Sequence, residues 1–204
     1  VEALNSISLK IYRGEKIALI GHNGSGKSSF LRLISEIYFP SSGKIYKKVK
    51  PYPMLSPSFI VSEVLTGIDS AKAHYLFRYG NLKGFENYLN DIVEFSGLGD
   101  FIALPIKTYS EGMKSRFIFS ILTFDKHEFL ALDEGIGTGD NSFYQKAEKR
   151  MKEFIANAGT LVFASHSPDL LNKFCSRGLV FSCGNIVYDG DLNGALNFYA
   201  KRNK

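Results

Sequence analysis

The apolar residues of this 204-residue chain follow two different spacings, and the change from one to the other predicts alternating strands and helices. Short apolar runs at 17–20, 128–132 and 161–164 are typical of buried strands, and near-alternation of apolar residues predicts an earlier strand at 4–11. Strands that alternate with helices favour an α/β fold with a mostly parallel sheet covered on both faces. Apolar residues at helical offsets predict helices in the segments 30–37, 85–93, 117–122 and 143–155.

Proline and glycine clusters indicate where these elements end. Pro40 to Gly43 is a breaker cluster after the first helix, and a short strand is expected at 44–49. Three prolines make residues 51–59 extended or looped. This stretch therefore separates the first strand and helix from a mostly helical insert, about residues 60–122.

The tail of the chain has a different pattern. Two short apolar runs, 179–181 and 186–188, flank Gly184-Asn185 and predict an antiparallel C-terminal hairpin, which a short helix follows. The length and the hydrophobic content of 45% fit one domain, residues 1–204, with a packed core.

Composition excludes several classes of protein. No stretch approaches the roughly 18 apolar residues of a membrane span, and the N-terminus has no signal pattern. Cys175 and Cys183 are too few and too isolated for a disulfide framework or a zinc site, which favours a reducing cytoplasm. Because the chain opens at Val1 and enters a predicted strand almost at once, we expect an N-terminal piece to be missing.

The formal charge of +5 is mild and spread along the chain. A nucleic-acid footprint would be denser, so no nucleic-acid partner is expected. The local concentrations of positive charge fit a solvated face, although a membrane surface or an acidic partner stays open. They lie at Lys44, Lys47, Lys48 and Lys50 and at Lys201, Arg202 and Lys204.

Residues 21–28 fit the phosphate-binding loop pattern of a glycine, four free positions and Gly-Lys-Ser, between a predicted strand and a predicted helix. That context disfavours an ordinary glycine-rich turn. Backbone N–H groups would surround a phosphate chain, Lys27 would neutralise the outer phosphates, and Ser28 would reach Mg²⁺. The residues expected to bind the nucleotide here are Gly21, Asn23, Gly24, Ser25, Gly26, Lys27, Ser28 and Ser29.

The apolar strand around Leu130 ends in two carboxylates, Asp133 and Glu134. Parallel strands bring their carboxyl ends to the ligand crevice, so both acids are expected near the phosphate loop. Asp133 would hold Mg²⁺, directly or through water, and Glu134 would deprotonate the attacking water. An exposed acidic strand end or a helix cap is the alternative interpretation.

Ser110, Glu111 and Gly112 lead into an amphipathic helix. The hydroxyl of Ser110 and the amide of Gly112 could donate to a second phosphate group at the helix N-terminus. Taken alone, this sequence is more typical of a helix N-cap, but its position between the phosphate loop and the acidic strand favours the phosphate site.

In order, these motifs resemble those of the ATP-binding subunits of ABC transporters, and the resemblance covers essentially the whole chain. The segments 109–114, Tyr-Ser-Glu-Gly-Met-Lys, and 132–140, Leu-Asp-Glu-Gly-Ile-Gly-Thr-Gly-Asp, are similar to subunits that export bacterial surface polysaccharides such as capsule, O-antigen and teichoic acid chains. The implied fold is a P-loop NTPase of the ABC ATPase type, with a helical subdomain inserted in the sheet core.

The resemblance also implies a mechanism. Two copies would form a head-to-tail dimer with two ATP molecules, each between the phosphate loop of one copy and the Ser110 to Gly112 signature of the other. Asp140 would lie in the loop that couples the two sites, and His166 would contact the terminal phosphate. The implied catalytic residues are Glu134, His166 and Lys27. A separate membrane permease would be the partner, which places the chain at the cytoplasmic face of the plasma membrane.

The chain departs from the family pattern in two places. The loop after Tyr52 lacks the usual glutamine, and the only glutamine is the distant Gln145. Ser56 or a backbone carbonyl with water would then complete the metal's coordination, or the contact is absent. The aromatic residue that stacks on adenine would precede Leu4, and Tyr12 is not assigned to that role.

Three alternatives remain at this stage. The chain could serve a different exporter, act as a soluble ABC ATPase on ribosomes, DNA or metal clusters, or be a non-hydrolytic scaffold. No coiled coil or basic arm of the soluble type is visible in the sequence, and the intact phosphate loop and acidic strand disfavour the scaffold.

Overall fold

A computed structural model describes residues 2–54, 62–133 and 141–202, without the side chains of residues 141 and 142. The chain divides into two compact units. The first unit comprises residues 1–55, 127–135 and 155–204, and the second comprises residues 56–126 and 136–154.

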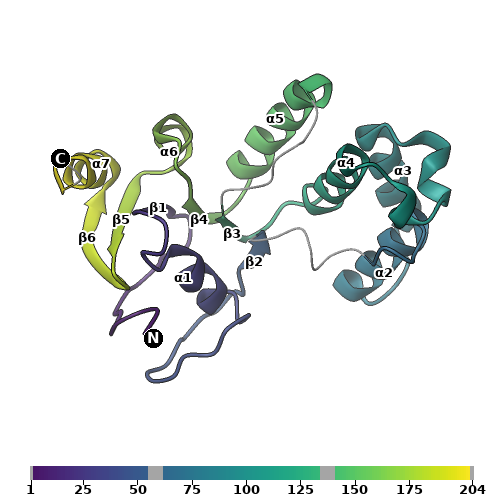
Figure 1. The fold of residues 1–204 in the computed structure, drawn as a ribbon. Coiled ribbons are helices and arrows are strands. Elements are labelled where there is room, and N and C mark those ends of the chain that lie inside the picture. Colours follow the sequence, from purple (N-terminus) through teal and green to yellow (C-terminus); the bar gives the residue numbers. More distant parts are fainter. Residues whose placement is uncertain (1, 55–61, 134–140, 203–204) are drawn as a thin grey trace. The chain divides into compact units, whose positions relative to one another are not determined.

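The first unit is built on one six-stranded sheet in the order β2-β3-β4-β1-β5-β6 (Figure 1). All neighbours are parallel except β5 and β6, which form the predicted antiparallel hairpin. The mostly parallel sheet and its antiparallel end are therefore confirmed. The strands are β1 (Lys16–Ile20), β2 (Tyr52–Met54), β3 (Phe129–Asp133), β4 (Thr160–Ala164), β5 (Arg177–Ser182) and β6 (Asn185–Asp191).

Helices cover both faces of this sheet. On one face, Phe30 and Leu31 of α1 (Lys27–Ile34) share a core cluster with Ile17 and Leu19 of β1. On the other, α7 (Leu192–Arg202) packs so closely on β5 that a Cβ atom added at Gly178 would lie 2.4 Å from the Cβ of Ala195. The third helix of this unit is α6 (Pro168–Phe174).

Two predicted strands are wrong. Residues 4–11 form no strand: Ser6 adopts a φ of 45°, which interrupts the extended backbone, and no residue of the segment pairs with any of the described strands of the sheet. Their alternating apolar residues, such as Leu4 and Ile7, instead pack partly buried on the sheet core. Residues 44–49 form no strand either; Lys47 folds back on Glu36 and on the Ile34 carbonyl at the end of α1.

The second unit is helical, as predicted for the insert. It contains α2 (Gly67–Tyr79), α3 (Phe85–Ser96), two short 3₁₀ helices (Gly99–Ala103 and Ile106–Thr108), α4 (Glu111–Leu122) and most of α5 (Asn141–Ala156). Its core cluster includes the buried side chains of Tyr88, Ile92 and Phe117. Gly97 ends α3 at a φ of 66°, the left-handed conformation that favours glycine at a helix end.

Salt bridges and cation–π contacts join α3 to α5 within the second unit. Arg150 of α5 pairs with Asp91, and its guanidinium lies 4.2 Å from the ring centroid of Phe95. Lys146 donates to the carbonyls of Glu94 and Phe95 at 3.0 and 3.1 Å, near the C-terminus of α3. Two cations thus complement the negative end of that helix.

Candidate functional site

A cavity of about 650 Å³ lies at the carboxyl ends of strands in the first unit. Such a position is where open α/β sheets bind ligands. The lining comes from five separate stretches of the chain: Glu2 and Ala3; Asn23, Gly24, Gly26, Lys27, Ser28 and Ser29; Asp133; Ala164, Ser165 and His166; Cys183 and Gly184.

The phosphate loop connects β1 to α1 and turns through left-handed backbone at Gly24 and Gly26, with φ of 79° and 112°. Gly26 is the N-cap of α1, and the first turn of that helix carries no acidic residue. The unpaired N–H groups of a helix N-terminus attract anions, and here no carboxylate in the first turn competes with them. The loop is therefore suited to a phosphate group.

Lys27 is held inside this loop with only 8% of its surface exposed. Its Nζ atom donates to the Gly21 carbonyl at 2.6 Å and to the His22 carbonyl at 3.0 Å. The ammonium charge is thus positioned by the loop's own backbone, while the residue still lines the cavity.

Gly21 and Ser25 belong to the phosphate loop but do not line the cavity. A Cβ at Gly21 would be 2.6 Å from both the Phe181 carbonyl and the Ser25 hydroxyl, so only glycine fits there. The buried Ser25 hydroxyl has no hydrogen-bond partner within the described part of the chain. A buried polar atom of this kind is usually satisfied by a water molecule or a ligand, so the loop fits a bound phosphate chain.

Asp133 and His166 reach the same cavity from neighbouring strands. Asp133 ends β3 and pairs in register with Ala164, the last residue of β4. His166 follows β4 in a tight turn, where the Ser165 hydroxyl accepts from the Ser167 N–H at 3.1 Å. Parallel pairing of β3 with β4 therefore brings together a carboxylate and an imidazole that are distant in sequence.

Ser110, Glu111 and Gly112 belong to the second unit, at the start of α4. The Ser110 hydroxyl accepts from the Met113 N–H at 3.2 Å, which makes Ser110 the N-cap. As an acceptor it keeps its own proton for a further partner. Glu111 pairs with Lys114, which also pairs with Glu63. The hydrogen bond from Lys114 lowers the pKa of Glu63.

The predicted residues thus fall into four groups. Gly21 and Ser25 belong to the phosphate loop but do not line the cavity, and Ser110, Glu111 and Gly112 belong to the second unit. Those that the structure brings to one cavity are Asn23, Gly24, Gly26, Lys27, Ser28, Ser29, Asp133 and His166. Glu134 and Asp140 lie outside the described residues, as does Ser56. Tyr12 is exposed and is not part of the cavity lining.

Sequence reasoning missed six lining residues. Two of them, Ala164 and Ser165, directly precede the predicted His166, and that position was a signal for them. The other four are Glu2, Ala3, Cys183 and Gly184. The hairpin turn at Gly184 was predicted, but its place beside the phosphate loop follows from the pairing of β5 with β1. A single sequence carries no signal of strand order, so these four residues could not have been assigned.

None of the helices within 2–54, 62–133 and 141–202 combines the length and the apolar character needed to cross a bilayer.

Comparisons with known proteins agree on one family. A sequence model of the ABC transporter family matches residues 4–137. The chain is 39% identical over 193 residues to the O-antigen export system ATP-binding protein RfbE of Yersinia enterocolitica, which covers 95% of this chain and 80% of that protein. It is 34% identical to the teichoic acids export ATP-binding protein TagH of Bacillus cereus, over 97% of this chain but only 36% of TagH.

Solved structures show the same fold. The ATP-binding cassette MJ0796, solved as a dimer in a post-hydrolysis state with ADP and phosphate, superposes with a TM-score of 0.71 at 18% identity. The superposition covers 93% of this chain and 90% of that one.

Proposed function

Because this chain belongs to the ABC transporter family, we propose that it is the ATP-binding and ATP-hydrolysing subunit of a transporter that exports a bacterial cell-surface polysaccharide. Two relatives are named as ATP-binding proteins of O-antigen export and of teichoic acid export, and these names support a polysaccharide as the cargo. The share of each relative that the chain spans varies from 80% to 36%, so cargo and partner rest on the family and not on this chain's own residues.

The observation that carries the proposal is the meeting of Lys27, Ser28, Asp133 and His166 in one cavity. Lys27 and the α1 N-terminus supply positive potential for the outer phosphates of ATP. His166 would contact the terminal phosphate, and its position in the cavity lining after β4 supports this role. Positioning and charge neutralisation of this kind are the main protein contributions to phosphoryl transfer.

Mg²⁺ would be held by the Ser28 hydroxyl and the Asp133 carboxylate. Both line the cavity, and both are oxygen ligands of the type that Mg²⁺ prefers. When bound, the ion neutralises charge on the phosphate oxygens. Glu134, next to Asp133 in the sequence, is the proposed general base that takes a proton from the attacking water.

A second copy of the chain is proposed to complete each site. Ser110, Glu111 and Gly112 would bind the phosphates across a head-to-tail dimer, and Asp140 would couple the two sites. The N-cap geometry of Ser110 supports this assignment, since its hydroxyl proton is available to an anion.

The proposed partner is an integral-membrane permease, with this subunit peripheral at the cytoplasmic face of the membrane. Nucleic acid is not a proposed partner. The permease would recognise the cargo, and no residue of this chain is assigned to the polysaccharide.

ATP turnover with Glu134→Gln tests the enzymatic part of the proposal. We expect the variant to bind ATP with wild-type affinity, to lose about 10² to 10⁴-fold in turnover because the general base is removed, and to accumulate as an ATP-bound dimer on size exclusion. Glu128→Gln, directly before β3 and paired with exposed Arg13, is the control. Wild-type turnover in Glu134→Gln would contradict the assigned base.

Affinity purification from detergent-solubilised membranes tests the transport part. A stoichiometric integral-membrane partner supports an exporter, whereas recovery of ribosomes or nucleic acid would support a soluble ABC ATPase instead.

A further inference from the structure

The turn between β5 and β6 touches the phosphate loop directly. The Gly184 N–H donates to the Ser25 carbonyl at 2.9 Å, and the Gly184 carbonyl accepts from the Asn5 N–H at 2.8 Å. Gly184 therefore joins the phosphate loop on one side to the N-terminal segment on the other.

The N-terminal segment passes so close to this turn that side chains are excluded. A Cβ on Gly184 would lie 2.9 Å from the Ala3 carbonyl oxygen, and a Cβ on Gly26 would lie 3.0 Å from the same oxygen. Both distances are shorter than ordinary contacts of a Cβ atom. Ala3 is thus in contact with the turn and with the phosphate loop at once.

Cys183, next in the turn, is held in an unfavourable backbone conformation. Its φ of 46° is left-handed, which is rare for a residue that carries a Cβ atom. Its carbonyl accepts from the side-chain amides of Asn5 at 3.1 Å and of Asn185 at 3.0 Å. Strained residues persist only where surrounding contacts over-determine them, and they concentrate at functional sites.

The hydrogen bond to Ser25 has a defined effect on the phosphate loop. The Ser25 carbonyl and the Gly26 N–H belong to one planar trans peptide group, in which the two point in opposite directions. Fixing the carbonyl on Gly184 therefore also fixes the direction of the Gly26 N–H, at the N-cap of α1.

We propose that residues 3–5 and 183–185 form a strap that holds the phosphate loop at Ser25 and Gly26 in the shape that binds nucleotide. Ala3, Cys183 and Gly184 also line the cavity, whereas Asn5 does not and is a positioning residue. The inference rests on the proposed function, because it assigns the strap a role in nucleotide affinity.

The primary test compares Gly184→Ala with Gly43→Ala. Both glycines have a left-handed φ, 76° and 80°, but a Cβ at Gly43 would meet nothing within 4 Å. Gly43→Ala therefore controls for backbone strain alone. We expect Gly184→Ala to raise the Kd and the KM for ATP about tenfold with kcat changed less than about threefold, and Gly43→Ala to stay within about twofold.

A second variant keeps the test meaningful if Gly184→Ala folds poorly. Asn5→Ala removes the side-chain bond to Cys183 and leaves every backbone contact. We expect about a threefold rise in the Kd for a fluorescent ATP analogue and faster hydrogen exchange at the Gly184 amide.

The outcomes separate the two proposals. If the wild-type chain binds ATP, and both strap variants bind it as tightly as Gly43→Ala although the Gly184 amide exchanges faster, the strap inference is wrong and the proposed function stands. If the wild-type chain binds no nucleotide, the proposed function fails and the role of the strap fails with it.

Discussion

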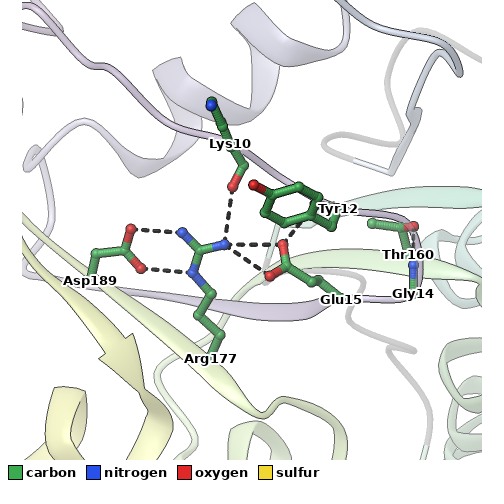
Figure 2. Close-up of polar contacts among 7 residues, drawn as sticks. All are labelled: Lys10, Tyr12, Gly14, Glu15, Thr160, Arg177 and Asp189. Carbon is green, nitrogen blue, oxygen red and sulfur yellow. Dashed lines mark hydrogen bonds and ion pairs between the residues drawn. The ribbon is translucent and has the colours of Figure 1, made fainter.

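The two ends of the central sheet use their polar groups in opposite ways. At the carboxyl ends, glycines and polar side chains such as Lys27, Asp133 and His166 line a cavity of about 650 Å³. At the amino ends, Arg177 closes the structure: its guanidinium makes two bonds of 2.7 Å to Asp189 and two of 3.0 and 3.1 Å to Glu15 (Figure 2).

At the closed end the charged side chains pair with one another, whereas at the open end backbone carbonyls hold Lys27, which also lines the cavity. Figure 2 shows that Arg177 also donates to the Lys10 carbonyl, so one side chain joins the N-terminal segment to the hairpin. The hydrogen bond to Asp189 is the main reason why the pKa of Arg177 is raised. This contrast teaches that changes at the open end should alter activity, and changes at the closed end should alter stability.

The largest expected effect is on activity, at the open end. Lys27→Ala removes the cation beside the proposed phosphates, and we expect ATP turnover to fall about 10² to 10³-fold. Lys16→Ala, at the amino end of the same β1 strand, is the matched control and should keep turnover within about twofold. A large loss of turnover in Lys16→Ala would break the contrast between the two ends.

The next effect is on stability, at the closed end. Arg177→Ala leaves Asp189 and Glu15 without their shared partner, and we expect the free energy of unfolding to fall by about 2 kcal/mol. In a chain of this size this corresponds to a Tm lower by about 4–8 °C.

The exposed pair between Arg13 and Glu128 provides the control for Arg177. Arg13→Ala should change the free energy of unfolding by less than about 0.5 kcal/mol. If Arg177→Ala weakened ATP binding in the folded protein while its Tm stayed at the wild-type value, the closed end would have to be assigned a role in the site.

We expect mild acid to destabilise the protein through His74, which belongs to neither end of the sheet. In the second unit, burial lowers the pKa of His74 from 6.5 to about 4. Between these values the unfolded chain binds a proton that the folded chain does not, so the free energy of unfolding falls as the pH decreases from about 6.5 to about 4.

We expect this loss to be about 1–2 kcal/mol, once the partial exposure of His74 is allowed for. Urea unfolding at pH 7 and pH 5 measures it. His74→Gln should flatten the dependence, whereas His22→Gln, on the exposed part of the phosphate loop, should not. An unchanged slope in His74→Gln would mean that another group titrates.

The smallest expected effect concerns the chemical labelling of the two cysteines, which lie one at each end of β5. Cys183 is exposed and lines the cavity, and Cys175 is buried, which raises the pKa of its thiol to about 12. We expect a thiol reagent to label Cys183 at least about tenfold faster. ATP should slow the labelling of Cys183 alone, as measured by mass spectrometry.

The sequence patterns correctly predicted those elements that depend on residues nearby in the chain. The run before Gly21 became β1, and the predicted turn at Gly184 lies where the β5–β6 hairpin needs it. Residues 4–11 and 44–49 have strand-like patterns too, yet a strand also needs a neighbour in the sheet. That neighbour is decided by tertiary contacts, which the pattern of one segment does not contain.

The residues of the candidate site are of the same two kinds: some follow from a local sequence pattern, and others depend on tertiary contacts. The chemistry of Lys27 and Ser28 follows from a contiguous motif, so sequence alone could predict it. The contribution of Cys183 depends on the order β4-β1-β5, and that of Ala3 depends on the path of the N-terminal segment over Gly26.

The same strand order has a consequence for how the protein is made. The cavity draws on residues from Glu2 to Gly184, so a ribosome must synthesise the chain through Gly184 before the last wall of the site exists. The main core cluster of the second unit, by contrast, lies within residues 62–126, and segments with contacts at shorter sequence separation fold early. A bound nucleotide can therefore stabilise the chain once Gly184 has been made, but it cannot guide the first steps of folding on the ribosome.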